Sequence, residues 1–310
     1  MDRQKTKGVI LMLLSAGCYS ATVCLLKLIG HIDAVFSAFM RFVFGLVLLG
    51  VIIGIRRRMP RFSNIRLLLA RGILGGIAIY TAYLVIIHLG VSKGTMIIFT
   101  YPVFGTLFGG LLLKETLRVS NFIALGLAMT GLFLLVMSGH EGQDFVLIGR
   151  YELIGIGTAM LSGLIVAIIR KLHQTDGAFE IFFFHCLLGA AVLMLPAMHV
   201  PFEFTGRDWI ILAVIGIFAT AGQLCMTQGY RYLPVQKASL LSMSELILDC
   251  TVGIAVFHEA VTVQFGIGAV LIVSACVIVL SLREKSLIPE RPCEIIDPVC
   301  TEQSTDLNPL

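Results

Sequence analysis

The chain has 310 residues, of which 57% are hydrophobic and 14% charged, and its formal net charge at pH 7 is +4. Its mean hydropathy of +0.95 lies far outside the range of soluble globular proteins, in which about a quarter of the residues are charged. The composition predicts a multi-pass membrane protein, and no basic groove with interleaved aromatic residues points to a nucleic-acid partner.

Ten apolar windows of about 20 residues, the length that crosses the hydrocarbon core of a bilayer, follow one another along the chain. The first window follows a short basic stretch, but it is too long for a signal peptide and a second window follows at once, so we predict an uncleaved first helix. The windows cover residues 8–29, 34–55, 67–88, 92–113, 119–138, 150–170, 179–199, 209–230, 236–257 and 263–282.

The second half of the chain repeats the first at a fixed shift of 144 positions. Five windows fall in each half, and because five is odd the second copy enters the membrane from the opposite side. We therefore predict an all-α integral membrane protein of ten transmembrane helices in two inverted five-helix repeats, residues 1–143 and 144–285. A Pro-rich, acidic and disordered cytoplasmic tail, residues 286–310, is expected to follow. The shift pairs Leu89 with Leu233, Lys93 with Lys237, Arg41 with His185 and Gly72 with Gly216.

The distribution of Lys and Arg supports this number of spans. With the N-terminus in the cytoplasm, eighteen of these residues fall on the cytoplasmic side, Arg71 and Arg170 included, and three on the opposite side, Lys93, Arg150 and Arg207. Cytoplasmic loops of membrane proteins carry an excess of basic residues. We therefore expect both termini in the cytoplasm.

The ninth window carries two carboxylates, Glu245 and Asp249, four residues apart and hence on one helix face, with Ser242 one turn earlier. Each carboxylate would cost roughly 2.5 to 3.5 kcal/mol at the centre of a lipid-facing helix, so this face must look into a watery or protein-lined cavity. We predict that all three residues bind substrate and that both carboxylates are candidates for proton coupling. The alternative is that Arg41 or His185 neutralises a carboxylate in a buried pair.

Arg41 and His185 occupy equivalent positions of the two repeats, inside the second and seventh windows. A buried Arg41 needs an acidic partner or an anionic part of a substrate, and the sequence leaves both open. An unperturbed histidine titrates near neutrality, so His185 is a third candidate for proton coupling, with a hydrogen-bonded packing role as the alternative.

Aromatic and amide side chains at similar depth are expected to complete the cavity lining, because tyrosine combines a flat face with a polar group. Pro102 is expected to bend the fourth span. Tyrosines near window ends are read as interfacial residues: Tyr151, Tyr230 and Tyr232. The expected lining residues are Tyr19, Tyr80, Tyr83, Tyr101 and Gln223.

Other notable residues have structural readings. Glu115 and Glu259 close the fourth and ninth windows and are expected to cap the following helix or to bond a loop. Two Gly-x-x-x-Gly pairs, Gly72/Gly76 and Gly105/Gly109, are expected to permit close helix packing. The eight cysteines form no CxxC pair and are read as packing residues. No metal or cofactor site is predicted, and no HExxH or P-loop motif indicates an enzyme.

The chain resembles the drug/metabolite transporter superfamily in its ten-helix form with two EamA-type repeats. The resemblance rests on residues 94–115, with Tyr101-Pro102 and a terminal Lys-Glu115, and on residues 238–259, with Glu245-Leu246 and a terminal His-Glu259. Where that family often reads Glu-Pro, this chain has Glu245-Leu246, which leaves open whether the ninth span kinks there.

The resemblance implies a basket of helices around a central cavity, lined by spans one, three, four, six, eight and nine, with spans five and ten outside. It also implies an inner (plasma) membrane exporter of amino acids or related small metabolites, driven by a proton gradient or by the gradient of the solute.

We therefore expect a secondary active transporter that exports small organic metabolites such as amino acids by alternating access, without a cofactor. Its expected partners are a small-molecule substrate, protons if transport is proton-coupled, and the lipid bilayer, and we expect a monomer or a weak homodimer. Three alternatives stay open: an uptake or exchange carrier for nucleobase-like or cationic drug-like compounds, a passive channel, and a non-transporting membrane scaffold.

Overall fold

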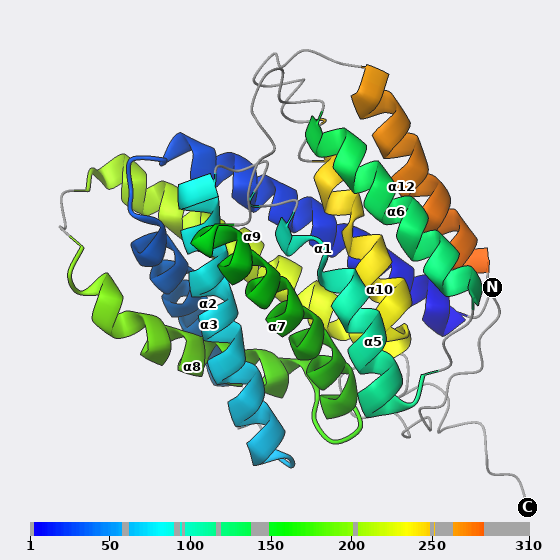
Figure 1. Cartoon of the computed structure of the whole chain (residues 1–310). Helices are drawn as coiled ribbons and strands as arrows, with labels where there is room; N and C mark the ends of the chain where they lie inside the picture. Colours follow the sequence, from blue (N-terminus) through cyan, green and yellow to red (C-terminus); the bar gives the residue numbers. More distant parts are fainter. Residues whose placement is uncertain are drawn as a thin grey trace, which may run out of the picture.

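The structure of the chain is a computed structural model that describes residues 3–57, 62–89, 94, 97–115, 119–137, 149–200, 204–248, 251 and 263–281 (Figure 1). Within these residues every regular element is a helix. The helices are α1 (Arg3–Leu28), α2 (Ala34–Arg56), α3 (Ile65–Leu89), α5 (Tyr101–Leu113), α6 (Val119–Met137), α7 (Arg150–Leu172), α8 (Ala178–Ala197), α9 (Gly206–Tyr232), α10 (Val235–Ser242) and α12 (Val263–Ser281).

Each of the ten apolar windows coincides with helical structure, which confirms the predicted all-helical membrane fold. Six helices are long and apolar enough to cross a membrane, namely α1, α2, α3, α7, α8 and α9, and shorter apolar helices lie in α5, α6 and α12. The fourth and ninth windows are each interrupted by a turn, at residues 99–100 and at Met243, and residues 244–248 are helical again after the second turn.

Side-chain caps fix where several helices begin. Asp33 accepts a hydrogen bond of 2.7 Å from the Val35 amide at the start of α2. At the start of α9, Thr205 Oγ1 accepts from the Asp208 amide (3.4 Å) and Asp208 Oδ2 accepts from the Thr205 amide (2.9 Å). These contacts satisfy amides that have no partner inside the helix.

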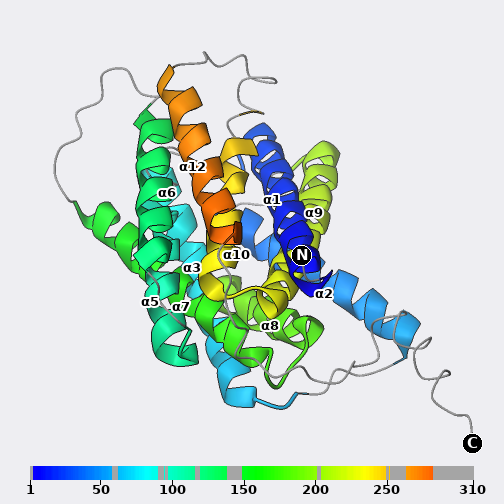
Figure 2. The same ribbon diagram turned by 90° about the vertical axis from the view of Figure 1, so that its right-hand side faces the viewer.

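The helices pair across the two repeats. The first helix of each repeat packs on the third helix of the other, α1 on α9 and α7 on α3, while the second helices, α2 and α8, pack on each other. The last helices, α6 and α12, also pack on each other and lie side by side at one edge of the bundle in both views (Figures 1 and 2). The core of the protein is therefore formed between the repeats.

Glycines allow the closest of these approaches. A Cβ atom added at Gly72 of α3 would lie 2.7 Å from the Phe184 carbonyl oxygen of α8, and one added at Gly76 would lie 3.1 Å from the Cα of Gly189. On the other side of the bundle, Gly105 of α5 faces Val166 of α7. The two Gly-x-x-x-Gly pairs thus serve packing within the chain, as the sequence predicts.

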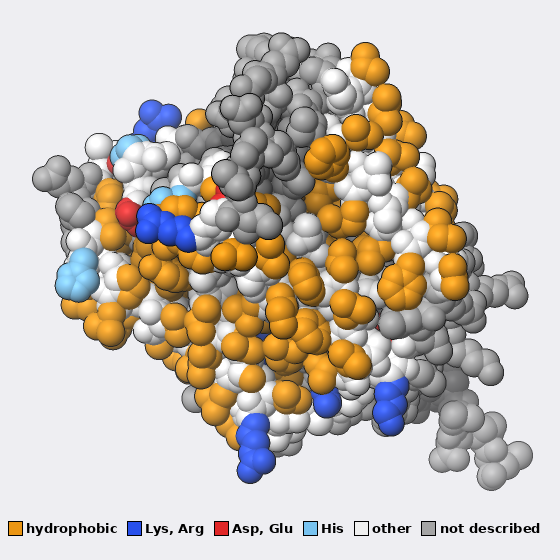
Figure 3. Space-filling model, viewed as in Figure 1, with side chains coloured by type: hydrophobic (Ala, Val, Ile, Leu, Met, Phe, Trp, Pro, Cys, Tyr) orange, Lys and Arg blue, Asp and Glu red, His pale blue; other side chains and the backbone are white. Residues whose placement is uncertain are grey.

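Hydrophobic side chains cover the outside of the bundle as well as its core. Figure 3 shows them across one face, with Lys and Arg side chains gathered at its edges. Exposed apolar residues on this outer surface include Ile73, Ile77, Leu107, Leu153 and Ile156. Such a surface is unfavourable in water and favourable against lipid.

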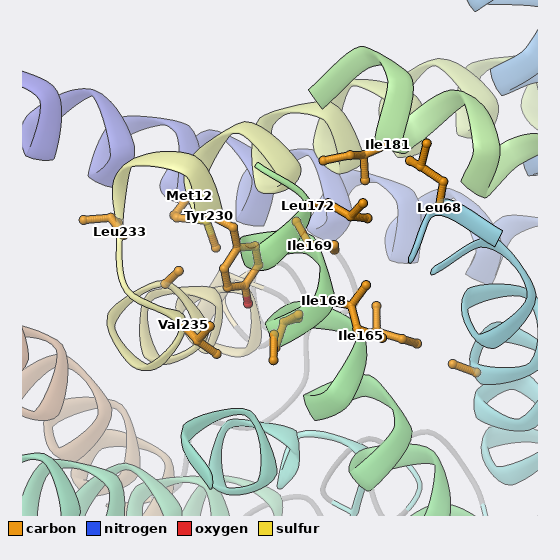
Figure 4. Close-up of a cluster of buried hydrophobic side chains, with 14 of the residues drawn as sticks. Met12, Leu68, Ile165, Ile168, Ile169, Leu172, Ile181, Tyr230, Leu233 and Val235 are labelled. Atoms are coloured by element: carbon orange, nitrogen blue, oxygen red, sulfur yellow. The ribbon is translucent and has the colours of Figure 1, made fainter. Parts of the chain in front are cut away.

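The largest buried cluster lies where the chain passes from α9 to α10. Figure 4 shows the ring of Tyr230 between Val235 of α10 and Ile168 and Ile169 of α7, with Met12 of α1 nearby. Tyr230 is fully buried, with an exposed fraction of 0%. Its reading as an interfacial tyrosine is therefore wrong, because four helices enclose a position that hydropathy alone places near a window end.

Candidate functional site

A buried amide in the middle of the bundle joins three helices. Gln223 of α9 accepts hydrogen bonds at Oε1 from Tyr19 Oη of α1 (2.7 Å) and from Arg41 Nη2 of α2 (3.1 Å). The Arg41 guanidinium carbon also lies 5.4 Å from the centroid of the Tyr19 ring, within the range of a cation–π contact. Three residues predicted to bind substrate therefore meet in one contact network.

The position of Arg71 on α3 differs from the one that the sequence analysis assigns to it. The sequence analysis counts it with the cytoplasmic basic residues, but its exposed fraction is 2% and its Nη1 lies 3.0 Å from Nδ1 of His185 on α8. Arginine can only donate, so His185 accepts at Nδ1 in its neutral form. Arg71 lies too far along α3 to be a loop residue, and it adds a buried guanidinium to the half-buried one of Arg41.

The surroundings of His185 are aromatic. The Phe42 ring meets the imidazole edge to face, with centroids 5.0 Å apart, and His185 itself is 2% exposed. Tyr80 and Tyr83 of α3 pack against the hydrophobic cluster that includes Phe42 and Phe182, and Tyr83 lies close enough to Arg41 to interact with its charge. This half of the site thus contains Tyr19, Arg41, Arg71, Tyr80, Tyr83, His185 and Gln223.

A second polar cluster consists of hydroxyl groups. The Tyr230 and Ser239 hydroxyls lie 3.0 Å apart in the buried core, and Tyr101 lies close enough to Tyr230 and Ser242 to interact with both. Ser242 also donates to the Ala238 carbonyl at 3.2 Å. The predicted residues Tyr101 and Ser242 are therefore neighbours, and they are joined by Tyr230 and Ser239, which the sequence analysis did not select.

Glu245 lies close to both clusters. It is half-buried on the helical segment 244–248 and interacts electrostatically with Tyr19 on one side and Tyr101 on the other. Arg41 donates to Gln223 and His185 lies 3.0 Å from Arg71, and the alternative that one of them also neutralises a carboxylate stays a prediction. Asp249 lies outside the described residues.

The turns that interrupt the fourth and ninth spans are equivalent. Thr100 Oγ1 donates to the Ile97 carbonyl (2.6 Å), and Ser244 Oγ donates to the Leu241 carbonyl (2.7 Å). The donors Thr100 and Ser244 are 144 positions apart, and so are the acceptors Ile97 and Leu241. The same side-chain bond thus marks the same break in each repeat.

The breaks also answer two expectations about helix geometry. Pro102 falls in the first turn of α5, after the break, where its missing N–H has no cost. It therefore starts a helix instead of bending one. In the second repeat the break comes at Met243, before Glu245-Leu246, so the ninth span is interrupted without a proline.

One end of the bundle is tied together by a carboxylate. Glu115, after α5, accepts from the Val235 amide at the start of α10 (3.1 Å to Oε2) and lies 3.3 Å from Nε of Arg170 on α7. Nη1 of Arg170 donates to the carbonyls of Tyr230 (2.8 Å) and Arg231 (2.7 Å). We use the name α9–α10 end for this group, which consists of Glu115, Arg170, His173, Tyr230, Arg231 and Val235. Glu115 does cap a helix, but the helix belongs to the other repeat.

His173 closes the same end beside α9. Its Nε2 lies 2.7 Å from the Thr227 carbonyl oxygen, and the side chain is buried just after the last residue of α7. Burial lowers the pKa of His173 to about 4, against the opposing effect of that hydrogen bond, and Arg231 and Arg170 lower it as well. The residue is therefore a neutral part of the packed end at physiological pH.

Sequence reasoning missed three residues of the site, and one of them, Arg71, had a visible signal. Arg71 lies inside the third apolar window, residues 67–88, and not before it, so the cost of a buried charge already marked it. Tyr230 and Ser239 had no such signal, because only their contacts with other helices bury them. Among the described residues no group of three His, Cys, Asp or Glu side chains is placed to hold a metal ion.

Comparisons with known proteins agree with this architecture. The human protein Solute carrier family 35 member G1 is 23% identical over 291 residues, which cover 89% of this chain and 79% of that protein. The Pseudopaline exporter CntI of Pseudomonas aeruginosa is 23% identical over 273 residues, covering 87% of this chain and 94% of that protein.

A solved crystal structure superposes with a TM-score of 0.74 at 17% sequence identity, covering 88% of this chain and 96% of that one, which shows a shared fold. The model of the EamA-like transporter family matches twice, over residues 6–137 and 149–281. Because these matches cover most of the chain, the protein belongs to the EamA-like transporter family, within the drug/metabolite transporter superfamily, and is a multi-pass membrane transporter of a small molecule and not an enzyme.

Proposed function

We propose that this protein is a secondary active carrier that exports small organic metabolites such as amino acids by alternating access. The observation that carries the proposal is the central site itself. Charged and polar groups from both repeats, among them Arg41, Arg71, Gln223 and Glu245, meet between helices whose outer surfaces are apolar. Buried charges in a membrane protein mark a substrate or ion pathway.

Two further features support alternating access. The fourth and ninth spans are broken at equivalent positions next to the site, and interrupted helices at corresponding positions of two repeats are a property of secondary transporters. The α9–α10 end is packed and hydrogen-bonded, so access to the site in this conformation would come from the opposite end. A carrier must also adopt a second conformation, in which the contacts of the α9–α10 end separate and the site opens to that side.

The orientation and location belong to the same proposal. We place the protein in the inner (plasma) membrane with both termini in the cytoplasm, so that the α9–α10 end faces the cytoplasm. The excess of Lys and Arg on that side supports this orientation. Export as the direction of transport is supported by the printed name of one relative, an exporter.

Glu245 is proposed as the residue on which substrate binding, and proton coupling if present, chiefly depends. Its place near both polar clusters supports the role, since a carboxylate can accept hydrogen bonds from an ammonium group or take up a proton. Asp249, a turn further along the sequence, is proposed to assist it, and His185 stays a secondary candidate. The hydroxyl cluster with Tyr101 and Ser242 would contact the less polar part of the substrate.

Counterflow in proteoliposomes tests the proposal. Vesicles preloaded with an amino acid should accumulate the labelled amino acid with saturation, which neither a channel nor a scaffold produces. Glu245→Gln keeps the shape of the side chain and should abolish pH-dependent uptake while the protein still folds, and Asp249→Asn should only weaken uptake. The matched control is Asp33→Asn, which changes an exposed capping carboxylate to another good cap.

The outcomes separate the candidate functions. Linear, non-saturable flux would indicate a channel, and absence of flux for every metabolite class would indicate a scaffold. Unchanged affinity and an unchanged pH profile in Glu245→Gln would assign Glu245 a structural role. If nucleobases or cationic drugs exchange and amino acids do not, the substrate class of the proposal is wrong while the carrier mechanism stands.

A further inference from the structure

We propose that Arg71, with Arg41 and Gln223, forms a subsite for an oxyanion of the transported molecule, a carboxylate or a phosphate group. This inference rests on the proposed carrier function and names the chemistry of the substrate at the same site. It assigns a role to Arg71, which the sequence analysis counts only among the basic residues that set the topology.

Hydrogen-bond donors outnumber acceptors in this part of the site. The Gln223 Oε1 acceptor is already used by both Tyr19 and Arg41, while the Gln223 amide nitrogen, buried in a residue that is 4% exposed, has no partner among the described residues. Within the same part of the chain, Arg71 Nε is also buried without a hydrogen-bond partner. Burying a donor without an acceptor is unfavourable, so the cluster is complementary to a ligand rich in acceptor oxygens.

The charges lead to the same ligand. Arg41 and Arg71 act electrostatically on each other and on Tyr19, and neither makes an ion pair with a carboxylate among the described residues. A buried guanidinium, that of Arg71, and a half-buried one, that of Arg41, have no paired acid among the described residues, an unfavourable arrangement in a membrane protein unless an anion joins them. An oxyanion between them would neutralise charge and accept hydrogen bonds at once.

The orientation of Arg71 leaves the suitable edge of its guanidinium for a ligand. His185 takes Nη1, whereas Nε and Nη2 form the edge of arginine that binds both oxygens of a carboxylate or phosphate side by side. Glu245, near Tyr19, offers the opposite charge for an ammonium group of the same substrate. An amino acid fits both ends, and a simple organic acid fits the arginine end.

The packing around Arg71 indicates a built site. A Cβ atom at Gly75, one turn after Arg71, would collide with Arg71 Nη1 and lie 2.7 Å from His185 Nδ1. The glycine thus makes room for the guanidinium and the imidazole, and Phe42 holds the imidazole edge to face. These contacts fix one side of the guanidinium so that little side-chain freedom is lost when an anion binds.

Matched pairs of acids and neutral analogues test the chemistry of the subsite. Purified wild-type protein is titrated with L-leucine and L-leucinamide, with succinate and succinamide, and with glycerol 3-phosphate and glycerol, and the melting temperature and Kd are recorded. At least one acid should stabilise the protein while its neutral partner at the same concentration does not. The carboxylate and phosphate pairs show which oxyanion the site takes.

Variants at position 71 test the residue. Arg71→Gln should weaken binding of the acid roughly tenfold to a hundredfold, because bonds to charged groups are lost, and Arg71→Lys should lose less because it keeps the charge. The matched control is Arg66→Gln, the same change at an exposed position of the same helix. Without ligand, Arg71→Gln should melt at or above the wild-type temperature, since an unpaired buried charge has been removed.

Three results would overturn the subsite. In the first, acids and neutral analogues stabilise the protein equally, or the acids do not stabilise it. In the second, Arg71→Gln binds the acid with wild-type affinity. In the third, ligand-free Arg71→Gln melts below both wild type and Arg66→Gln or fails to fold. The last would show that Arg71 stabilises the fold instead.

Failure of the carrier proposal gives a different pattern. Arginine-dependent binding of acids without counterflow in proteoliposomes would keep the subsite and reject the carrier. Saturable counterflow that is unchanged in Arg71→Gln would keep the carrier and reject the subsite.

Discussion

His173 is a single residue whose protonation bears on the stability of the whole α9–α10 end. It is neutral in the folded protein because its pKa is lowered to about 4 from the ordinary value of 6.5. As the pH falls from about 6.5 to about 4, the unfolded chain binds a proton that the folded chain does not. The contribution of His173 to stability is therefore complete above pH 6.5 and is lost progressively toward pH 4.

His173→Gln should remove this pH dependence. Its amide can still donate to the Thr227 carbonyl, but it does not titrate. Between pH 7 and pH 5 the wild-type protein should lose roughly 2 kcal/mol more unfolding free energy than the variant. Chemical denaturation of both proteins at several pH values measures the difference, and parallel curves would show that His173 has the same pKa in the folded and the unfolded protein.

At the scale of elements, Glu115 holds three helices that are far apart in the sequence. Its carboxylate bonds the first amide of α10 and the Arg170 side chain of α7, and Arg170 in turn bonds the last carbonyls of α9. The contact satisfies an amide at a helix start and places a negative charge there, which the helix dipole favours. Glu115 and Arg170 consequently hold the ends of α7, α9 and α10 together at the α9–α10 end.

Glu115→Gln should loosen this unit without changing its shape. Loss of the charge weakens both the ion pair and the helix cap, so we expect a fall of about 1–3 kcal/mol in unfolding free energy. The neighbouring change Lys114→Gln, at an exposed side chain, is the control and should have little effect. Thermal melts in detergent decide the matter, and equal melting temperatures for the two variants would mean that Glu115 does not fasten the helices.

At the scale of the whole molecule, the most extensive helix contacts are between the repeats, with α1 on α9, α7 on α3, and α6 beside α12 (Figure 2). No residue of the candidate site lies on α6 or α12, which agrees with the scaffold role that the family resemblance implies. The two repeats therefore share one site, and each supplies different side chains to it.

The proposed orientation of this molecule can be tested with single cysteines. In a protein without its native cysteines, position 57, after α2, should react with an impermeant thiol reagent only when the cytoplasmic side is open. Position 141, outside the described residues, should react from the external medium in intact cells. The expectation comes from the excess of Lys and Arg on one side, and external labelling at position 57 would reverse it.

The sequence by itself determined which segments are helices, because a chain in a bilayer must satisfy every backbone amide and carbonyl within apolar stretches of fixed minimum length. It also determined the repeat, since the 144-residue shift pairs the hydroxyl of Thr100 with that of Ser244 at the same helix break. The cost of charge in lipid was enough to single out Glu245 and Arg41.

Only the tertiary structure decided which of these residues meet. Tyr19 and Gln223 are separated by 204 positions and Arg71 and His185 by 114, yet both pairs are in hydrogen-bond contact. Arg71 looked like a loop residue and Tyr230 like an interfacial one, but in the packed bundle both are buried, Arg71 beside α8 and Tyr230 among α1, α7 and α10. Hydropathy records the average environment of a segment, whereas burial of one side chain depends on which helix faces it, and that is set by the close packing of the whole bundle.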